Sequence, residues 1–229
     1  MGSLDKERTY KDIKRVKRSR LEAGAHYDNI SRYYDYIEGS FEKRIRLIGL
    51  DLLRIEEGEY ILDIGSGTGQ TLIEIADRVG AKGKAVGIDI SPGMIMICKE
   101  RLKKDDLLES VDLVRGDAIS LPFKDNHFDR VFLSFTLELF DTPEIPIVLE
   151  DIKRILKDKG KIGVVSLAKE ENIFVYIYEI FHDLFPKVID CRPLYVESML
   201  ENEGFEIEEV REGRIGVLPI RVLRAKASR

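Results

Sequence analysis

The stretch Ile61-Leu62-Asp63-Ile64-Gly65-Ser66-Gly67-Thr68-Gly69-Gln70 decides the fold of this chain. An apolar run that ends in Asp63 is typical of a buried strand, and the helical periodicity of Thr71 to Ala76 follows at once. The three glycines between them permit positive φ angles and a close approach of the backbone, and a helix start presents free N–H groups. The stretch therefore predicts a strand, a tight loop and a helix that together bind part of a nucleotide-like ligand.

The spacing of the glycines argues against a dinucleotide. The dinucleotide fingerprint is G-x-G-x-x-G with an acid about 20 residues further on. Here the spacing is G-x-G-x-G, and Gln70 stands at the place of the last glycine. A second predicted strand, Lys84 to Asp89, ends in an acid that is well placed to accept hydrogen bonds from ribose hydroxyls. Asp63 and Asp89 together indicate another adenosine-containing ligand.

Five segments in order resemble the motifs of class I S-adenosylmethionine (SAM)-dependent methyltransferases. They are Leu62–Gly69 (motif I), Gly87–Ser91 with Met94 (motif II), Gly116–Ala118 with Leu121–Phe123, Phe128–Ser134 (motif IV), and Leu149–Leu156 with Gly160–Ile162. The resemblance covers roughly residues 26 to 168, and the ordered set is far more specific than any one motif.

The resemblance implies SAM as the cofactor and assigns a set of binding residues. After the opening acid Asp63, the methionine part of SAM would be held by Gly65, Gly67, Thr68 and Gly69. The ribose would be bound by Asp89, and the adenine by Ile90, Met94, Asp117 and Ala118. Ser134, at the end of motif IV, would lie near the methionine end.

A segment before the first strand, Tyr27 to Asp35, resembles the lid of the UbiE-like branch (also called methyltransferase type 11). In that branch the segment folds over bound SAM, and Tyr27 and Tyr34 are the matching positions. An aromatic ring beside a sulfonium supplies a cation–π contact and excludes water. The alternative is that these tyrosines only dock an N-terminal helix.

Length and element order predict one α/β domain. The chain has 229 residues, and strands alternate with helical stretches from Ile61 to Leu167, which is typical of a doubly wound parallel sheet. Two C-terminal strands, Phe205–Glu209 and Pro219–Ala227, are predicted to be joined around Gly213 and Gly216. We therefore expect a Rossmann-like, seven-stranded sheet with an antiparallel edge hairpin in residues 26–229, preceded by a basic helical tail in residues 1–25.

Charge is distributed unevenly. The net charge is −5, yet residues 1–20 hold eight Lys/Arg against three acids. A basic tail can touch nucleic acid or an anionic membrane, but a solvated helix packing loosely on the domain is the simpler interpretation. The acidic body argues against broad binding of RNA or DNA.

Composition limits the location and the cofactors. Two cysteines and no Cys/His cluster with ligand spacing predict neither a disulfide framework nor a metal site. No apolar run is long enough to span a bilayer, so we expect a cytoplasmic protein. One Gln, four Asn and 34% charged residues suggest a thermophilic source.

An apolar segment after the fifth strand, Asn172 to Pro186, predicts a helix that is buried on more than one side. It would either cover a pocket for an apolar acceptor or form a core or dimer contact. The sequence is compatible with both a monomer and a homodimer. Its His182 is a weak candidate for a general base, and a structural histidine is the alternative. Glu138 could face the pocket and orient a substrate, or could begin the next helix.

The favoured function is methyl transfer from SAM to a small, apolar molecule. The lid and motif I suggest a quinone-like carbon acceptor, but the segment Gly213 to Pro219 departs from the quinone-enzyme pattern. The alternatives are a nucleic-acid (RNA) methyltransferase, which only the basic tail supports, and a SAM-binding protein without turnover.

Overall fold

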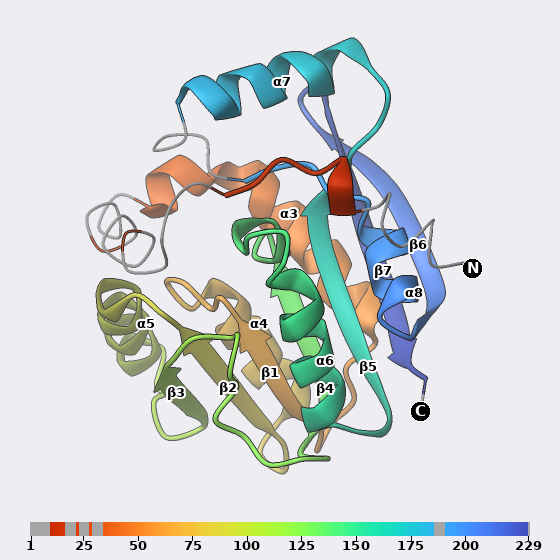
Figure 1. Ribbon diagram of the computed structural model, residues 1–229. Helices are drawn as coiled ribbons and strands as arrows, with labels where there is room; N and C mark the ends of the chain where they lie inside the picture. Colours follow the sequence, from red (N-terminus) through yellow and green to blue (C-terminus); the bar gives the residue numbers. More distant parts are fainter. Residues whose placement is uncertain (1–9, 17–21, 23–27, 29–33, 186–190, 229) are drawn as a thin grey trace.

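A seven-stranded sheet in the order β3-β2-β1-β4-β5-β7-β6 forms the centre of the molecule (Figure 1). The computed structural model describes residues 10–16, 22, 28, 34–185 and 191–228, and of residues 34–41 only the backbone. The predicted α/β class, the doubly wound order and the antiparallel C-terminal edge are confirmed.

The parallel half of the sheet is built on central strands that are buried on both faces, with a partly exposed strand at its edge. Its strands are β1 (Tyr60–Ile64), β2 (Lys84–Asp89), β3 (Val111–Arg115) and β4 (Phe128–Ser134). β1 pairs in parallel with β2 on one side and with β4 on the other. Continuous apolar runs suit such strands, because helices cover both faces of the sheet. The carboxyl ends of these strands consequently share one edge.

The C-terminal edge is longer than predicted. β5 (Leu156–Leu167) pairs antiparallel with β7 (Leu218–Ala227), which in turn pairs antiparallel with β6 (Phe205–Ile215). Gly213 was predicted to lie in the connection, but it lies within β6 opposite Ile220. The connection itself is the short turn at Gly216, whose φ is +59°.

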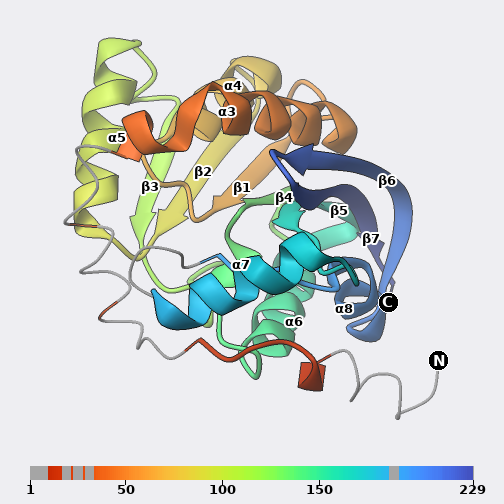
Figure 2. The same ribbon diagram turned by 90° about the horizontal axis from the view of Figure 1, so that it is seen from above.

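Helices cover both faces of the sheet (Figure 2). One face carries α3 (Tyr34–Leu53), α4 (Gln70–Val79) and α5 (Pro92–Lys104). The other face carries α6 (Ile145–Ile155) and α8 (Val196–Asn202). In α4 the buried side chains recur with a spacing of three or four residues, which places them on one face of the helix.

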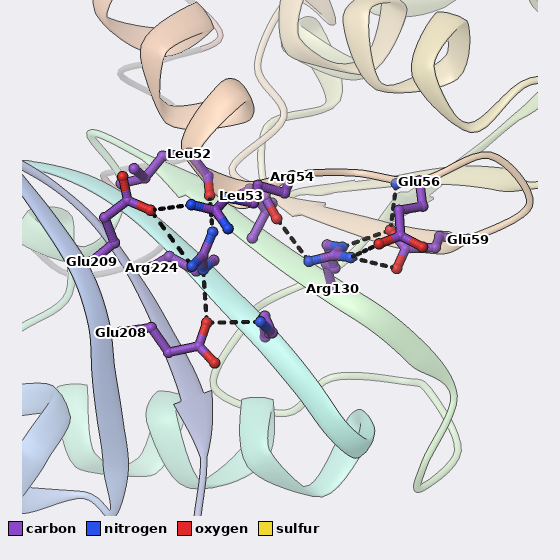
Figure 3. Close-up of polar contacts among 10 residues, drawn as sticks. Leu52, Leu53, Arg54, Glu56, Glu59, Arg130, Glu208, Glu209 and Arg224 are labelled. Carbon is purple, nitrogen blue, oxygen red and sulfur yellow. Dashed lines mark hydrogen bonds and ion pairs between the residues drawn. The ribbon is translucent and has the colours of Figure 1, made fainter.

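Two buried arginines from the sheet bind the end of α3 (Figure 3). Arg130 Nη1 donates to the carbonyl of Leu53 at 2.7 Å, and Arg224 Nη1 donates to that of Leu52 at 2.8 Å. The last carbonyls of a helix have no partner within the helix and carry partial negative charge, so cations stabilise them. Arg130 is held in turn by both carboxylate oxygens of Glu59, at 2.6 and 2.7 Å.

Residues 10–16 of the predicted basic tail lie against the domain. Ile13 is 4% exposed and belongs to the main apolar core. Arg15 makes a bidentate ion pair with Asp141, and Lys14 pairs with Asp183. This part of the tail is therefore bound more closely than the loosely packed, solvated helix that we predicted, because a few side chains anchor it individually.

The helix after β5 corrects a prediction. α7 (Ile173–Leu184) is apolar nearly all round, as expected, yet only Val175 and His182 are buried. The outward side chains, with Phe185 beyond the helix, are each 39–65% exposed: Ile173, Phe174, Tyr176, Ile177, Ile180, Phe181, Leu184 and Phe185. α7 lies above the carboxyl end of β5 (Figure 1) and touches the domain on one side only. Within the described chain, no helix is long and apolar enough to cross a membrane.

Candidate functional site

The loop of residues 65–69, here called the glycine loop, joins β1 to α4. Gly65, Gly67 and Gly69 have φ angles of +73°, +53° and +85°, which only glycine adopts without strain. A Cβ atom on Gly65 would overlap the side chain of Thr136, and one on Gly69 would overlap the Cys98 sulfur. The sequence therefore turns sharply here because no other residue fits the space or the backbone angles.

Neighbouring elements hold the glycine loop in place. The Asp89 carboxylate accepts the N–H of Gly67 at 2.8 Å, and Arg101 Nη1 donates to the Thr68 carbonyl and hydroxyl oxygens at 3.0 and 2.9 Å. Asp89 stands at the end of β2 and Arg101 lies on α5. The loop is thus fixed before any ligand arrives, which favours rigid binding.

A pocket opens beside the glycine loop. Its lining comes from α3, the loop, the start of α4 and the end of β4: Glu42, Arg46, Gly65, Ser66, Gly67, Thr68, Gln70, Thr71, Ser134 and Phe135. Arg46 is only 6% exposed, and its Nη2 donates to Gln70 Oε1 at 2.7 Å. Sequence reasoning missed Arg46, since one arginine in a helix that precedes the first motif carries no recognisable pattern.

Asp63 gives the site a buried acid with spare capacity. It is 2% exposed at the end of β1, and its Oδ2 has no hydrogen-bond partner among the described residues. The Ser66 hydroxyl oxygen is likewise buried without a partner. Burial raises the pKa of Asp63 well above its ordinary value, against the lowering effect of Arg46. Buried acceptors without partners are costly, so the pair suits a cationic group with N–H donors, such as the ammonium of SAM.

The residues predicted to bind the rest of SAM follow along the same edge. Asp89 ends β2, Ile90 follows it, and Met94 is buried in the first turn of α5. Asp117 follows β3 and accepts the N–H of Ile119 at 3.0 Å, next to the buried Ala118. In open α/β sheets, ligands bind at this edge. The arrangement fits an elongated nucleoside ligand that runs from Ser134 towards Asp117.

The predicted lid is described only in part. Tyr27 lies outside the described residues, and Tyr34 begins α3 but its side chain is not described. Asp28, between them in sequence, accepts hydrogen bonds from the Ser91 hydroxyl at 2.5 Å and the Gly93 N–H at 2.8 Å. Asp28 therefore reaches the start of α5, while the role of the segment as a lid remains a prediction.

Glu138 is more deeply buried than a pocket-facing residue should be. It lies in the short 3₁₀ turn η2 (Leu137–Leu139), is fully buried, and does not line the pocket beside the glycine loop. Its Oε1 accepts the N–H of Leu167 at 3.2 Å, whereas its Oε2 has no partner among the described residues. Burial raises the pKa of Glu138 to about 8.

His182 points inward from α7. It is 5% exposed, and its Nδ1 lies 3.7 Å from Asp183 Oδ1 and has no hydrogen-bond partner among the described residues. Burial lowers the pKa of His182, so the imidazole is neutral at pH 7. A neutral imidazole can accept a proton, and the assignment of His182 as a general base remains a prediction.

Arg192 joins three segments near α7. It is 1% exposed, donates to the Glu138 carbonyl at 3.2 Å and the Thr142 hydroxyl at 2.7 Å, and also binds the carbonyls of Lys14 and Phe140. We call the region of residues 10–16, η2, α7 and Arg192 the α7 end. No sequence pattern marked Arg192, because its partners are 50 or more residues away.

Comparisons with known proteins agree with this geometry. A family described as "Methyltransferase domain" matches residues 61–160. The demethylmenaquinone methyltransferase of Listeria welshimeri is 31% identical over 175 residues, which are 70% of this chain and 72% of that protein. That of Lactobacillus johnsonii is 32% identical over 135 residues, 58% of this chain and 54% of that protein.

A solved structure shares the fold. A SAM-dependent methyltransferase from Aquifex aeolicus superposes with a TM-score of 0.67 at 22% identity, covering 86% of this chain and 98% of that one. Sequence, fold and site geometry therefore agree. The chain belongs to the class I SAM-dependent methyltransferases, in the UbiE-like branch that includes the demethylmenaquinone methyltransferases.

Proposed function

We propose that this enzyme transfers the methyl group of SAM to a carbon atom of a small, apolar, quinone-type acceptor. The observation that carries the proposal is the similarity to demethylmenaquinone methyltransferases over 72% of the length of the Listeria welshimeri protein. The outward side of α7, at the carboxyl end of β5, is apolar (Figure 1), which supports an acceptor of low polarity.

The cofactor would be bound by polar groups at fixed positions. Arg46 suits the carboxylate of SAM, Asp63 Oδ2 and Ser66 Oγ suit its ammonium, and Asp89 suits its ribose hydroxyls. When bound, SAM supplies an electrophilic methyl group. The chain's own residues then have to align the acceptor carbon with that group and exclude water, which accounts for much of the rate enhancement in such reactions.

Phe135 is our candidate for a residue that positions the acceptor. It lines the pocket next to Ser134, and its φ is +51°, a left-handed conformation that is rare for a bulky residue. Its N–H donates to the Val165 carbonyl at 2.8 Å, which holds it there. Such strain, on the order of 1–3 kcal/mol, concentrates at functional sites. We infer that the strain places the aromatic ring beside the methyl group.

A nucleic-acid substrate has less support. Of the three described cations of the tail, Lys14 and Arg15 are paired with Asp183 and Asp141. The net charge is −5, and association with phosphate backbones needs unpaired cations. A SAM-binding protein without turnover is the remaining alternative, and release of S-adenosylhomocysteine distinguishes it.

The experiment is an acceptor panel with S-adenosylhomocysteine release as the readout. We expect turnover with a reduced prenylated naphthoquinone of the demethylmenaquinone type, less with the ring lacking the prenyl chain, and none with an RNA transcript. Phe135→Leu should lower turnover while SAM affinity by calorimetry stays within about threefold, since Leu keeps an apolar side chain of smaller volume but loses the ring. Turnover of RNA alone would replace the proposal, and no turnover with any acceptor would support the binding protein.

A further inference from the structure

Ser91 connects two carboxylates, one through its backbone N–H and one through its hydroxyl. Its backbone N–H donates to Asp89 Oδ1 at 2.8 Å, and its hydroxyl donates to Asp28 Oδ1 at 2.5 Å. The hydroxyl oxygen also accepts the N–H of Met94 at 3.1 Å, and Ser91 is completely buried. Asp28 is 63 residues earlier in the chain than Ser91. The link is therefore tertiary, and the sequence of α5 alone cannot supply it.

Asp28 completes the start of α5. Pro92 has no N–H, the Met94 N–H is bound by the Ser91 hydroxyl, and the Ile95 N–H is bound by the Ser91 carbonyl at 3.1 Å. The remaining N–H of the first turn, that of Gly93, donates to Asp28 Oδ1 at 2.8 Å. A carboxylate at a helix start accepts such hydrogen bonds and interacts favourably with the helix dipole.

Asp89 depends on the same turn for its orientation. One carboxylate oxygen accepts the N–H of Ser91 and the other accepts that of Gly67, both at 2.8 Å. Each oxygen keeps a further lone pair, which is available to a ribose hydroxyl. A shift of the Ser91 backbone would consequently tilt the carboxylate and disturb the glycine loop at the same time. Asp28, which accepts the hydrogen bond of the Ser91 hydroxyl, restrains Ser91 against such a shift.

We propose that Asp28 is a positioning residue for the cofactor: it holds Ser91, which in turn orients Asp89 and Gly67 for the ribose of SAM. The inference concerns cofactor binding and does not depend on the nature of the acceptor. Because coupling between two sites is reciprocal, bound SAM should also strengthen the contact of Asp28 with Ser91. Asp28 thus contributes to SAM affinity through another residue.

The test is a double-mutant cycle with Asp28→Ala, which removes the carboxylate acceptor, and Ser91→Ala in the full chain. Each single variant should weaken SAM binding in calorimetry about tenfold, the size expected for a lost hydrogen bond to a charged group. The double variant should be no weaker than the weaker single variant, because both substitutions break the same link. Losses that multiply in the double variant would show independent actions and would overturn the proposal.

A capping role alone predicts something different. Urea unfolding without SAM measures the contribution of the cap, and a loss of stability at unchanged SAM affinity would reduce Asp28 to a helix cap. Ser91→Thr, which keeps the hydroxyl, should restore SAM affinity to within about threefold, as Thr is also accepted at helix starts. If Ser91→Thr bound SAM as weakly as Ser91→Ala, that result would also contradict the proposal. Glu100→Gln, an exposed acid on the same helix, is the matched control and should change neither quantity.

Discussion

The glycine loop and the α7 end lie at the same edge of the sheet but are held together differently. The glycine loop is fixed by contacts between residues close in sequence: Gly67 with Asp89, 22 residues apart, and Arg101 with Thr68, 33 apart. The α7 end is fixed by contacts between distant segments, such as Arg192 with Lys14, 178 residues apart, and Lys169 with the Asp12 carbonyl, 157 apart.

This difference separates the cofactor site, which the members of a family share, from the acceptor site, which differs between enzymes. The cofactor is constant across the family, so a short motif can build its site from backbone geometry. The acceptor varies, and the α7 end uses side chains from both ends of the chain that can change independently. We therefore expect substitutions at the α7 end to alter stability or acceptor use without altering SAM binding.

The largest expected effect is that of Arg192→Ala. It removes the donor that binds the carbonyls of Lys14, Glu138 and Phe140, and leaving several buried acceptors short of a hydrogen bond costs about 3–5 kcal/mol of unfolding free energy in total. Urea unfolding measures the loss. Arg211→Ala, in an exposed ion pair with Glu209, is the control and should cost about 1 kcal/mol or less. If SAM affinity of the folded Arg192 variant fell as steeply, the two regions would not be independent.

Next in size is Gly69→Ala. It combines a positive φ, worth about 1–2 kcal/mol in a non-glycine residue, with overlap between the new Cβ and the Cys98 sulfur. Gly67→Ala carries the conformational cost alone, since a Cβ there meets only the Gly65 carbonyl oxygen at 3.9 Å. Gly69→Ala should therefore have a lower unfolding free energy than Gly67→Ala. Adding Cys98→Ala to the Gly69 variant should restore part of the stability that Gly69→Ala loses. An equal loss in both variants would remove the steric part of the argument.

A pH-dependent effect should follow at Glu138. Its pKa is raised from 4.5 to about 8 in the folded protein, so between these values the folded state binds more protons than the unfolded state. Stability contributed by the protonated carboxyl is therefore present below about pH 4.5 and is lost as the pH rises towards 8. Between pH 5 and 8 the unfolding free energy of Glu138→Gln should fall by roughly 2 kcal/mol less than that of the unmodified protein. This is well under the energy that corresponds to the full pKa shift. Parallel pH curves for the two proteins would disprove the assignment.

The smallest effect on the fold should come from Phe181→Asp. Phe181 is 47% exposed on the outward side of α7, and exposed substitutions usually change stability by less than about 0.5 kcal/mol. SAM affinity should be unchanged, while turnover of a prenylated naphthoquinol should fall, because a carboxylate at this apolar surface must be desolvated. Loss of SAM binding and folding together would instead make α7 part of the core.

The part of the fold around the glycine loop is well predicted from the sequence, for a physical reason. Strand β2 was predicted at its observed bounds, motif IV coincides with β4, and the glycines stand where positive φ angles occur, because these signals are local. Gly213 was misplaced since a glycine inside a strand resembles a turn. The predicted burial of α7 was wrong because composition reveals apolarity, whereas exposure depends on which neighbours the fold supplies. Arg46 was missed because a single arginine in a helix before the first motif forms no pattern. Arg192 was missed because its partners are 50 or more residues away.

The hydrogen bond from Arg224 to the end of α3 (Figure 3) affects the order in which the protein can fold during synthesis. The carbonyl of Leu52, near the beginning of the domain, receives its hydrogen bond from Arg224 on β7. β7 is the last described strand to leave the ribosome, yet it lies between β5 and β6. While translation continues, the end of α3 lacks one of its two arginines and β5 has an open edge. Open edges invite pairing with other chains, so the nascent protein is most exposed to misassembly just before Arg224 emerges.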